Sequence, residues 1–132
     1  MRVIIVGCSR VGAMVAKVLV ADGHQVTVVD INRSSFNRLG PDFPGEMVLG
    51  NGIDEDVLRK AGIEQAEGFA SLTNGDNRNI MAAQIAREIF HVPRVITRIY
   101  DPIRENVYRE LGLDTTSPTL TGVREIHRML KG

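Results

Sequence analysis

Residues 2–30 read RVIIVGCSRVGAMVAKVLVADGHQVTVVD, and the rest of the chain is interpreted outward from them. An aliphatic run ends at Gly7. An apolar segment of helical character begins at Gly12 and stops at Gly23, and a second strand-like run then ends in Asp30. The order strand, glycine turn, helix, strand and acid is the sequence fingerprint of a βαβ unit that binds a dinucleotide.

Each residue type in this fingerprint has a physical task. Gly7 lets the chain leave the strand in a tight turn, and Gly12 lets the next helix lie close to the sheet. The first helical N–H groups and the helix dipole can bind a phosphate. Asp30 can accept hydrogen bonds from both ribose hydroxyls. The alternative interpretation is a βαβ unit that has lost its ligand.

Three residues of the glycine turn have two interpretations each. Ser9 replaces the middle glycine of G-x-G-x-x-G, where it either crowds a pyrophosphate or hydrogen-bonds to it. Arg10 either contacts phosphates, on its own chain or across an interface, or is simply solvated. Cys8 is either a redox sensor whose pKa the helix N-terminus lowers, or a small apolar filler, which we favour.

Composition narrows the class of protein. The chain has 132 residues, which by length is one domain spanning residues 1–132. Sixteen basic and sixteen acidic residues cancel, so no net positive field favours nucleic acid or a membrane surface. No apolar run approaches the roughly 20 residues of a membrane span, and a strand from residue 2 leaves no room for a signal peptide. A single cysteine excludes an internal disulfide, and we expect a soluble cytoplasmic protein.

Strand-like and helix-like segments continue to alternate after Asp30. Further strands are predicted over residues 46–49, 68–72, 94–100 and 114–117. Helices are predicted over residues 32–39, 54–61, 101–111 and 119–129, and another helix follows the polar turn at 73–77 and ends at residue 90. This alternation predicts a Rossmann-like α/β fold: a doubly wound parallel sheet of about six strands in the order 3-2-1-4-5-6.

In this fold the ligand crevice lies outside the carboxyl ends of strands one and four, where the winding reverses. We therefore expect Asn51, Thr73, Asn74 and Arg98, which lie at or near strand ends, to reach the same edge as the glycine turn. An inward arginine in a parallel strand needs a partner, and for Arg98 we expect a ligand phosphate or a carboxylate such as Asp76.

No residue pattern indicates catalysis or a metal site. The histidines at 24, 91 and 127 have no metal-ligand spacing. The chain has no G-x-S-x-G elbow, no Cys/His pair suited to nucleophilic catalysis and no phosphate loop with G-K-[S/T]. We expect no catalytic residue and no metal ligand.

The order of these motifs resembles the nucleotide-binding regulatory domain of Trk/Ktr-type potassium uptake systems, also called the KTN or RCK N-terminal domain. The matching segments are VIIVGCSRVG at 3–12, GHQVTVVDINR at 23–33, LGNGIDEDVLRKAGIEQAEGF at 49–69, LTNGDNRN at 72–79, VPRVITRI at 92–99 and LGLDTTSPTL at 111–120. Many dehydrogenases share the first segments, whereas the later ones are more specific. Asn51 stands where the family commonly has aspartate, which with Ser9 leaves the identity of the ligand open.

The resemblance implies a non-catalytic domain that binds NAD(H), ATP or ADP. Such domains assemble as dimers and rings on the cytoplasmic face of a cation channel or transporter and gate it when the ligand is exchanged. By position, the resemblance assigns to phosphates Gly7, Cys8, Ser9, Arg10, Val11 and Gly12. It assigns Asp30 to the ribose, with Ile31 beside it. It assigns to the adenine side Asn51, Gly52 and Ile53, and to the far half of the ligand Thr73, Asn74 and Arg98. Many members carry a C-terminal lobe that this sequence lacks, so a single-domain subunit and a fragment are both open.

Three functions are weighed. The first is a cytoplasmic nucleotide-sensing regulatory subunit, held at the inner face of the membrane by a potassium channel or transporter subunit. The second is an NAD-dependent dehydrogenase or a fragment of one, which would need a substrate domain and a catalytic His, Lys or Tyr. The third is an assembly module with a vestigial pocket.

Two apolar stripes near the end of the sequence bear on assembly. One consists of Ile103, Val107 and Leu111, and the other of Leu120, Val123, Ile126 and Leu130. We predict at least a dimer with Val107 and Ile126 near its centre. The alternative is that both stripes pack on the sheet.

Overall fold

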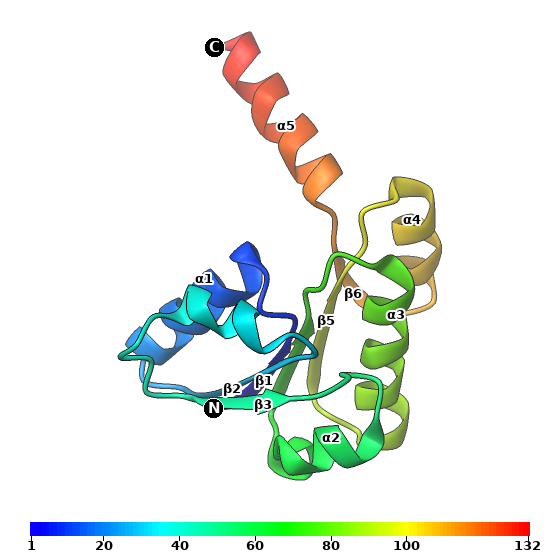
Figure 1. Cartoon of the computed structure of the whole chain (residues 1–132). Coiled ribbons are helices and arrows are strands. Elements are labelled where there is room, and N and C mark those ends of the chain that lie inside the picture. Colours follow the sequence, from blue (N-terminus) through cyan, green and yellow to red (C-terminus); the bar gives the residue numbers. More distant parts are fainter.

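The computed structural model describes residues 1–132 and shows strands and helices alternating along the whole chain (Figure 1). The strands are β1 (Arg2–Val6), β2 (Gln25–Asp30), β3 (Glu46–Leu49), β4 (Gly68–Ser71), β5 (Arg94–Arg98) and β6 (Asp114–Thr116). The α-helices are α1 (Arg10–Ala21), α2 (Glu55–Lys60), α3 (Asp76–Gln84), α4 (Pro102–Glu110) and α5 (Pro118–Lys131). Two 3₁₀ helices, η1 (Arg33–Leu39) and η2 (Ile63–Gln65), and a π-helix, η3 (Ile85–Ile89), complete the chain.

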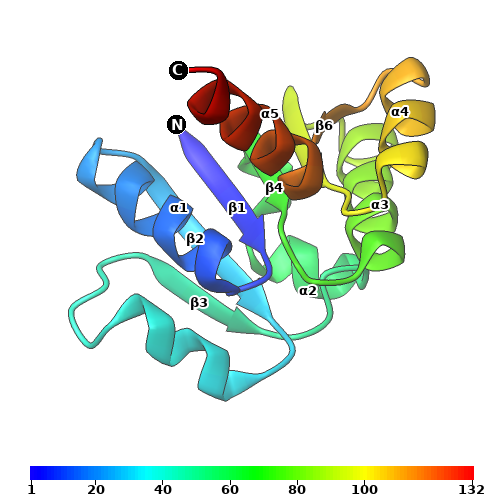
Figure 2. The ribbon, with the colours of Figure 1, turned by 90° about the horizontal axis from the view of Figure 1, so that it is seen from above.

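The six strands form one parallel sheet in the order β3-β2-β1-β4-β5-β6, which confirms the predicted topology. Figure 2 shows β3, β2, β1 and β4 in this order from above. The winding reverses between β1 and β4, because the chain builds outward from β1 to β3 and then returns to β4 on the other side. The carboxyl ends of β1 and β4 are therefore neighbours at one edge of the sheet.

Both faces of the sheet are covered, and β1 shows why its sequence is purely aliphatic. Successive side chains of a strand point to opposite faces. Val3 and Ile5 belong to a buried cluster that includes residues of α1 and η1. Ile4 and Val6 belong to a second cluster with residues of α2, α3 and η3. A central strand with a core on each side has no solvent-facing position for a polar residue.

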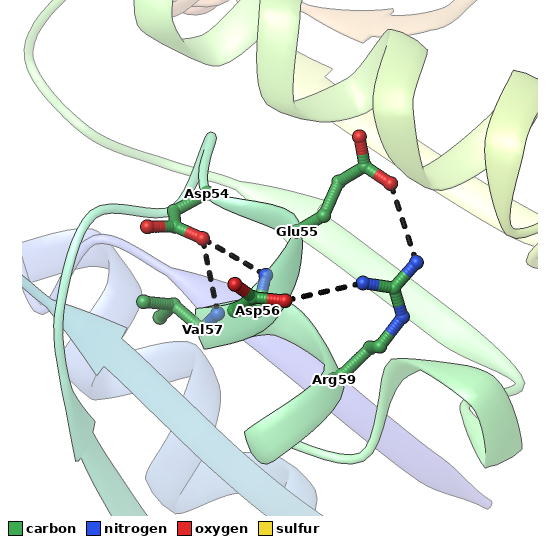
Figure 3. A network of polar contacts seen from close by, with 5 residues as sticks. All are labelled: Asp54, Glu55, Asp56, Val57 and Arg59. Atoms are coloured by element: carbon green, nitrogen blue, oxygen red, sulfur yellow. Dashed lines mark hydrogen bonds and ion pairs between the residues drawn. The ribbon is translucent and has the colours of Figure 1, made fainter.

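Helix α2 begins where the sequence predicts, because Asp54 caps it. The Asp54 carboxylate accepts hydrogen bonds from the backbone N–H of Asp56 at 2.8 Å and of Val57 at 3.4 Å (Figure 3). Arg59 pairs with Glu55 and Asp56 across the exposed side of the helix, which contributes little stability. The cap fixes the point where the loop after β3 enters the helix.

The helix after β4 differs from the single regular helix that the sequence predicts. It continues from α3 into the π-helix η3, and a π-turn shifts the phase of the side chains that follow it. Ile80 is buried and Ile89, in η3, is 49% exposed; Met81, which precedes the π-helix, is also 49% exposed because it lies on the outer face of α3. His91 then has a left-handed backbone, with φ 53°, and ends the helix where expected.

The last part of the chain, α4 to α5, covers little of the core. Glu105 of α4 is buried and accepts hydrogen bonds from Arg109 and from Thr115 Oγ1, which ties α4 to β6. No residue of α5 is buried, and the helix leads away from the body of the molecule (Figure 1). The alternative that both late apolar stripes pack on the sheet is therefore wrong, since Val107 and Ile126 are 47% and 60% exposed. The structure contains no helix with the length and apolarity that a bilayer crossing requires.

Candidate functional site

A cavity of about 410 Å³ lies at the carboxyl ends of β1, β2, β3 and β4, where the winding of the sheet predicts a crevice. This volume is within the range of small-molecule sites. Of the residues predicted for the site, the cavity is lined by Gly7, Cys8, Ser9, Asp30, Ile31, Asn51, Gly52, Ile53, Thr73 and Asn74. Residues from four strand ends, far apart in sequence, are thus brought together as expected.

Four predicted residues do not line the cavity: Arg10, Val11, Gly12 and Arg98. Arg10 and Val11 are exposed on the first turn of α1. Gly12 is buried beneath them, and a Cβ atom there would lie 2.0 Å from the carbonyl oxygen of Gly7. Glycine at this position is therefore what allows α1 to start so close to the turn.

The hydroxyl of Ser9 has two partners inside the protein. Its Oγ accepts a hydrogen bond from the N–H of Gly12 at 3.1 Å, which caps α1, and donates to the carbonyl oxygen of Leu72 at 2.8 Å. Ser9 thereby links the glycine turn to the end of β4. The hydroxyl proton is used in that link, so the structure gives Ser9 a capping role that the two sequence interpretations did not include.

The Asp30 carboxylate holds the glycine turn against the end of β2. Its Oδ2 accepts a hydrogen bond from the N–H of Cys8, and its Oδ1 accepts one from the N–H of Asn32, both at 2.8 Å. Each carboxylate oxygen has more than one acceptor position, so these bonds leave capacity for further donors. The side chain lines the cavity in an orientation that the two amides fix.

Cys8 is a core residue. It has no exposed surface and belongs to the same buried cluster as Val3 and Ile5. Burial raises the pKa of the Cys8 thiol above 9.0, and the nearby Asp30 carboxylate raises it further. The sensor interpretation expected a lowered pKa, which is wrong because desolvation outweighs any helix effect; the apolar-filler interpretation fits.

Two arginines line the cavity that sequence reasoning missed, Arg38 of η1 and Arg78 of α3; Ser35 and Gly50 were missed as well. Arg38 Nη1 donates to the carbonyl oxygen of Cys8 at 3.0 Å. Neither guanidinium is among the ion pairs of the structure, which involve other arginines. The position of Arg78 in the first turn after β4 was a usable signal, whereas Arg38 reaches the cavity only because η1 folds back over the end of β2.

Arg98 lies behind the cavity. It is 4% exposed, and its Nη2 donates to the carbonyl oxygens of Leu72 at 2.8 Å and Thr73 at 3.0 Å. Its guanidinium stacks on the Tyr100 ring at 4.9 Å, and its Nε has no hydrogen-bond partner. Arg98 therefore supports the backbone of the cavity wall.

The expected pairing of Arg98 with a carboxylate is wrong. The Asp76 carboxylate instead accepts hydrogen bonds from the backbone N–H groups of Tyr100, at 2.8 Å, and Asp101, at 3.1 Å. Asp76 binds two amides at the entrance to α4, and Arg98 bonds instead to the carbonyl oxygens at the end of β4.

The fold and the place of the cavity define the class of protein: a Rossmann-like, doubly wound domain with a crevice where the winding reverses. The family model described as the TrkA-N domain matches residues 3–117. The chain belongs to the TrkA-N domain family.

Similar proteins agree with this assignment. The chain is 50% identical over 117 residues to the Trk system potassium uptake protein TrkA of Streptomyces coelicolor, a match that covers 89% of this chain and 52% of that protein. The chain thus spans about half the length of the curated relatives that it matches.

Two solved structures share the fold. One is the Kef CTD of Shewanella denitrificans in its AMP-bound form, with a TM-score of 0.84 and 20% identity over 100% of this chain and 82% of that one. The other is the GsuK channel bound to NAD, with a TM-score of 0.83 and 23% identity over 98% of this chain and 23% of that one.

Proposed function

We propose that this chain is the nucleotide-sensing regulatory domain of a potassium ion transport system and that it binds NAD(H) or ATP/ADP in the cavity at the sheet edge. The observation that carries the proposal is the cavity itself. It combines the glycine turn before α1 with the oriented Asp30 carboxylate, in a chain of the TrkA-N domain family. The AMP bound by the Kef domain and the NAD bound by the GsuK channel fit this class of ligand.

The site's own groups suggest how a nucleotide would be held. Ser9 Oγ takes the N–H of Gly12, so the amides left for a phosphate are that of Ser9, which lines the cavity, and those of Arg10 and Val11, which follow it at the start of α1. The Asp30 carboxylate would accept hydrogen bonds from the ribose hydroxyls and repel a 2′-phosphate. Ile31 and Ile53 supply apolar surface at the same edge, suited to a base.

Regulation would arise from two conformations of the domain that bind nucleotides with different affinity. We propose that the chain acts as a homo-oligomer, a dimer or a ring, and that the α4–α5 face joins the subunits. Val107 and Ile126 are exposed on that face, and a two-fold contact would use the same stripe on both chains. The membrane partner would be a potassium channel or transporter subunit, with this domain on its cytoplasmic side.

Ligand binding tests the proposal directly. Mass spectrometry of the purified protein under native conditions is expected to show a bound adenine nucleotide, and NAD, ATP or ADP is expected to raise the melting temperature of nucleotide-free protein. Binding of the native state alone shifts apparent stability by mass action. No shift with any of these nucleotides would favour a vestigial pocket and contradict the proposal.

A turnover assay separates the proposal from a dehydrogenase. We expect no oxidation or reduction of common alcohols or hydroxy acids with NAD(H), because the lining residues of the cavity include no His, Lys or Tyr that could act as the catalytic acid or base. Steady turnover that is lost when a cavity residue is mutated would refute the regulatory assignment.

A further inference from the structure

We propose that Arg78 is a second phosphate-binding group of this cavity and that it selects nucleoside diphosphates and triphosphates over monophosphates. The inference rests on the proposed function, which places a nucleotide here, and it adds a residue and a selectivity to it. Arg78 lies on α3, on the wall formed by Thr73 and Asn74, whereas the glycine turn and Asp30 form the wall from β1 and β2.

The Arg78 guanidinium lies directly against Gly75, which has no side chain. A Cβ atom at Gly75 would lie 3.0 Å from both Nε and Nη2 of Arg78, tighter than nine in ten real contacts of this kind, so the guanidinium would have to shift by a few tenths of an ångström. The glycine has ordinary extended backbone, with φ −119° and ψ 117°, so its conformation does not itself demand glycine. What the glycine provides is room for the guanidinium to lie across the turn at the end of β4.

The charge of Arg78 is held in place but not neutralised. Its Nη2 donates to Asn74 Oδ1 at 3.0 Å, which orients the guanidinium. Its nearest acid in sequence, Asp76, binds the backbone amides of Tyr100 and Asp101 and forms no ion pair with Arg78. An arginine has five N–H donors, so most of those on Arg78 are free for an oxyanion.

The other charges of the cavity indicate what these donors would bind. The lining contains one carboxylate, Asp30, and two guanidiniums, Arg38 and Arg78, and is therefore net positive. Both oxygens of Asp30 and one nitrogen of Arg38 already bind backbone groups, those of Cys8 in the glycine turn and of Asn32 after β2. Arg78 is the lining cation on the opposite wall, and guanidinium geometry matches phosphate oxygens.

A selectivity follows from this placement. The first phosphate of a nucleotide would bind at the glycine turn, where the amides of α1 point. A monophosphate has no further group to extend toward α3, whereas the second and third phosphates of ADP and ATP continue across the cavity. Loss of Arg78 should therefore weaken the binding of ADP and ATP and leave the affinity for AMP almost unchanged.

Calorimetric titration of AMP, ADP and ATP into nucleotide-free protein tests this. Arg78→Gln is expected to weaken ATP and ADP binding about tenfold, the size of a lost charged hydrogen bond, and to change AMP binding by less than about twofold. Arg78→Lys keeps the charge but not the planar guanidinium that can bind two phosphate oxygens at once. Its affinities for ATP and ADP should lie between those of wild type and Arg78→Gln. Arg124→Gln on exposed α5 makes the same change in net charge and should leave all three affinities as they are.

A second variant acts on Arg78 without changing it. As a single substitution, Gly75→Ala should displace the guanidinium and lower the affinity for ATP and ADP. Added to Arg78→Gln, it should have no further effect on these affinities. Equal weakening of AMP and ATP by Arg78→Gln, or no weakening of either, would overturn the role of Arg78 while nucleotide binding itself stands. A wild type that binds none of the three would overturn the proposed function and this inference with it.

Discussion

The central strands of the sheet and the α4–α5 face are both rich in apolar residues, but only the strands bury them. In β1 every residue except Arg2 is buried, whereas α5 buries none of its residues. The crossover helices α1 and α3 return against the sheet because the strands on either side of them must pair. Helix α5 is joined to the sheet only through β6 and leads away from it. An apolar stripe at helical spacing therefore does not by itself show that its helix packs on the sheet.

The largest expected effect comes from placing the same charge in the two regions. Val28→Asp puts a carboxylate at a position with no exposed surface and should leave the protein unfolded at 25 °C. Val107→Asp, at a half-exposed position, should keep the fold, with a free energy of unfolding within about 0.5 kcal/mol of the wild-type monomer, and abolish the dimer. Circular dichroism and light scattering measure the two outcomes.

Either half of this comparison can fail. An unfolded Val107→Asp protein would place Val107 in the core. A wild type that stays monomeric at high concentration would end the assembly proposal.

Replacing one glycine in each region by alanine compares how tightly the two regions are packed around the backbone. Gly12→Ala puts a Cβ atom 2.0 Å from the Gly7 carbonyl oxygen and should lower the free energy of unfolding by about 3 kcal/mol. Gly122→Ala, in the middle of α5, meets no atom within 4 Å and should raise helix stability by about 0.5–1 kcal/mol. Urea unfolding followed by circular dichroism compares them, and effects of the same sign would contradict the contrast.

A third test asks whether ligand binding belongs to the sheet edge alone. Asp30→Ala should weaken NAD binding by roughly 1–3 kcal/mol through lost charged hydrogen bonds. The carboxylate control is Glu125→Ala on exposed α5, which should leave the affinity unchanged. In the wild type, NAD or ATP should raise the melting temperature more than NADP does. If NADP stabilises the wild type as well as NAD, the role of Asp30 is misassigned.

The smallest expected effect is a pH dependence at Cys8. Because the pKa of the buried thiol is raised, the folded state keeps its proton where the unfolded state loses it. The stability from Cys8 is fully present below pH 9.0, the ordinary pKa, and declines as the pH rises above it, by no more than about 1.4 kcal/mol per pH unit. Urea unfolding at pH 8 and pH 10 should show a shallower loss in Cys8→Ala, and parallel profiles would contradict the assignment.

The sequence predicted the fold well because strand and helix periods alternate without a break and the glycine turn marks the first crossover. Residues at or just after a strand end, such as Asp30 and Thr73, lie at the predicted edge of the sheet for the same reason. Arg38 and Arg78 were missed, because they reach the cavity from helices, and the reach of a side chain depends on how its helix lies. The Arg98 partner was predicted wrongly, since Asp76 had closer amides to bind.

The direction of α5 could not be predicted, because the stripe of Leu120, Val123 and Ile126 has the pattern of a helix that packs on its own sheet. Similarly, the change from α3 to the π-helix η3 leaves no mark in the apolar spacing, and Ile89, which lies in η3, is half exposed. Both failures concern how elements lie relative to one another, which local periodicity does not encode.

The exposure of α5 has a consequence for amide hydrogen exchange. A helix of 14 residues that buries no side chain and contains Gly122 near its middle is marginal in water on its own. In a monomer its amide protons should therefore exchange almost as fast as those of an unstructured peptide, while those of β1 exchange only on global unfolding. Covering the stripe with a second copy would protect them, so the entropy lost in ordering α5 would make the dimer weaker and more reversible than its buried area suggests.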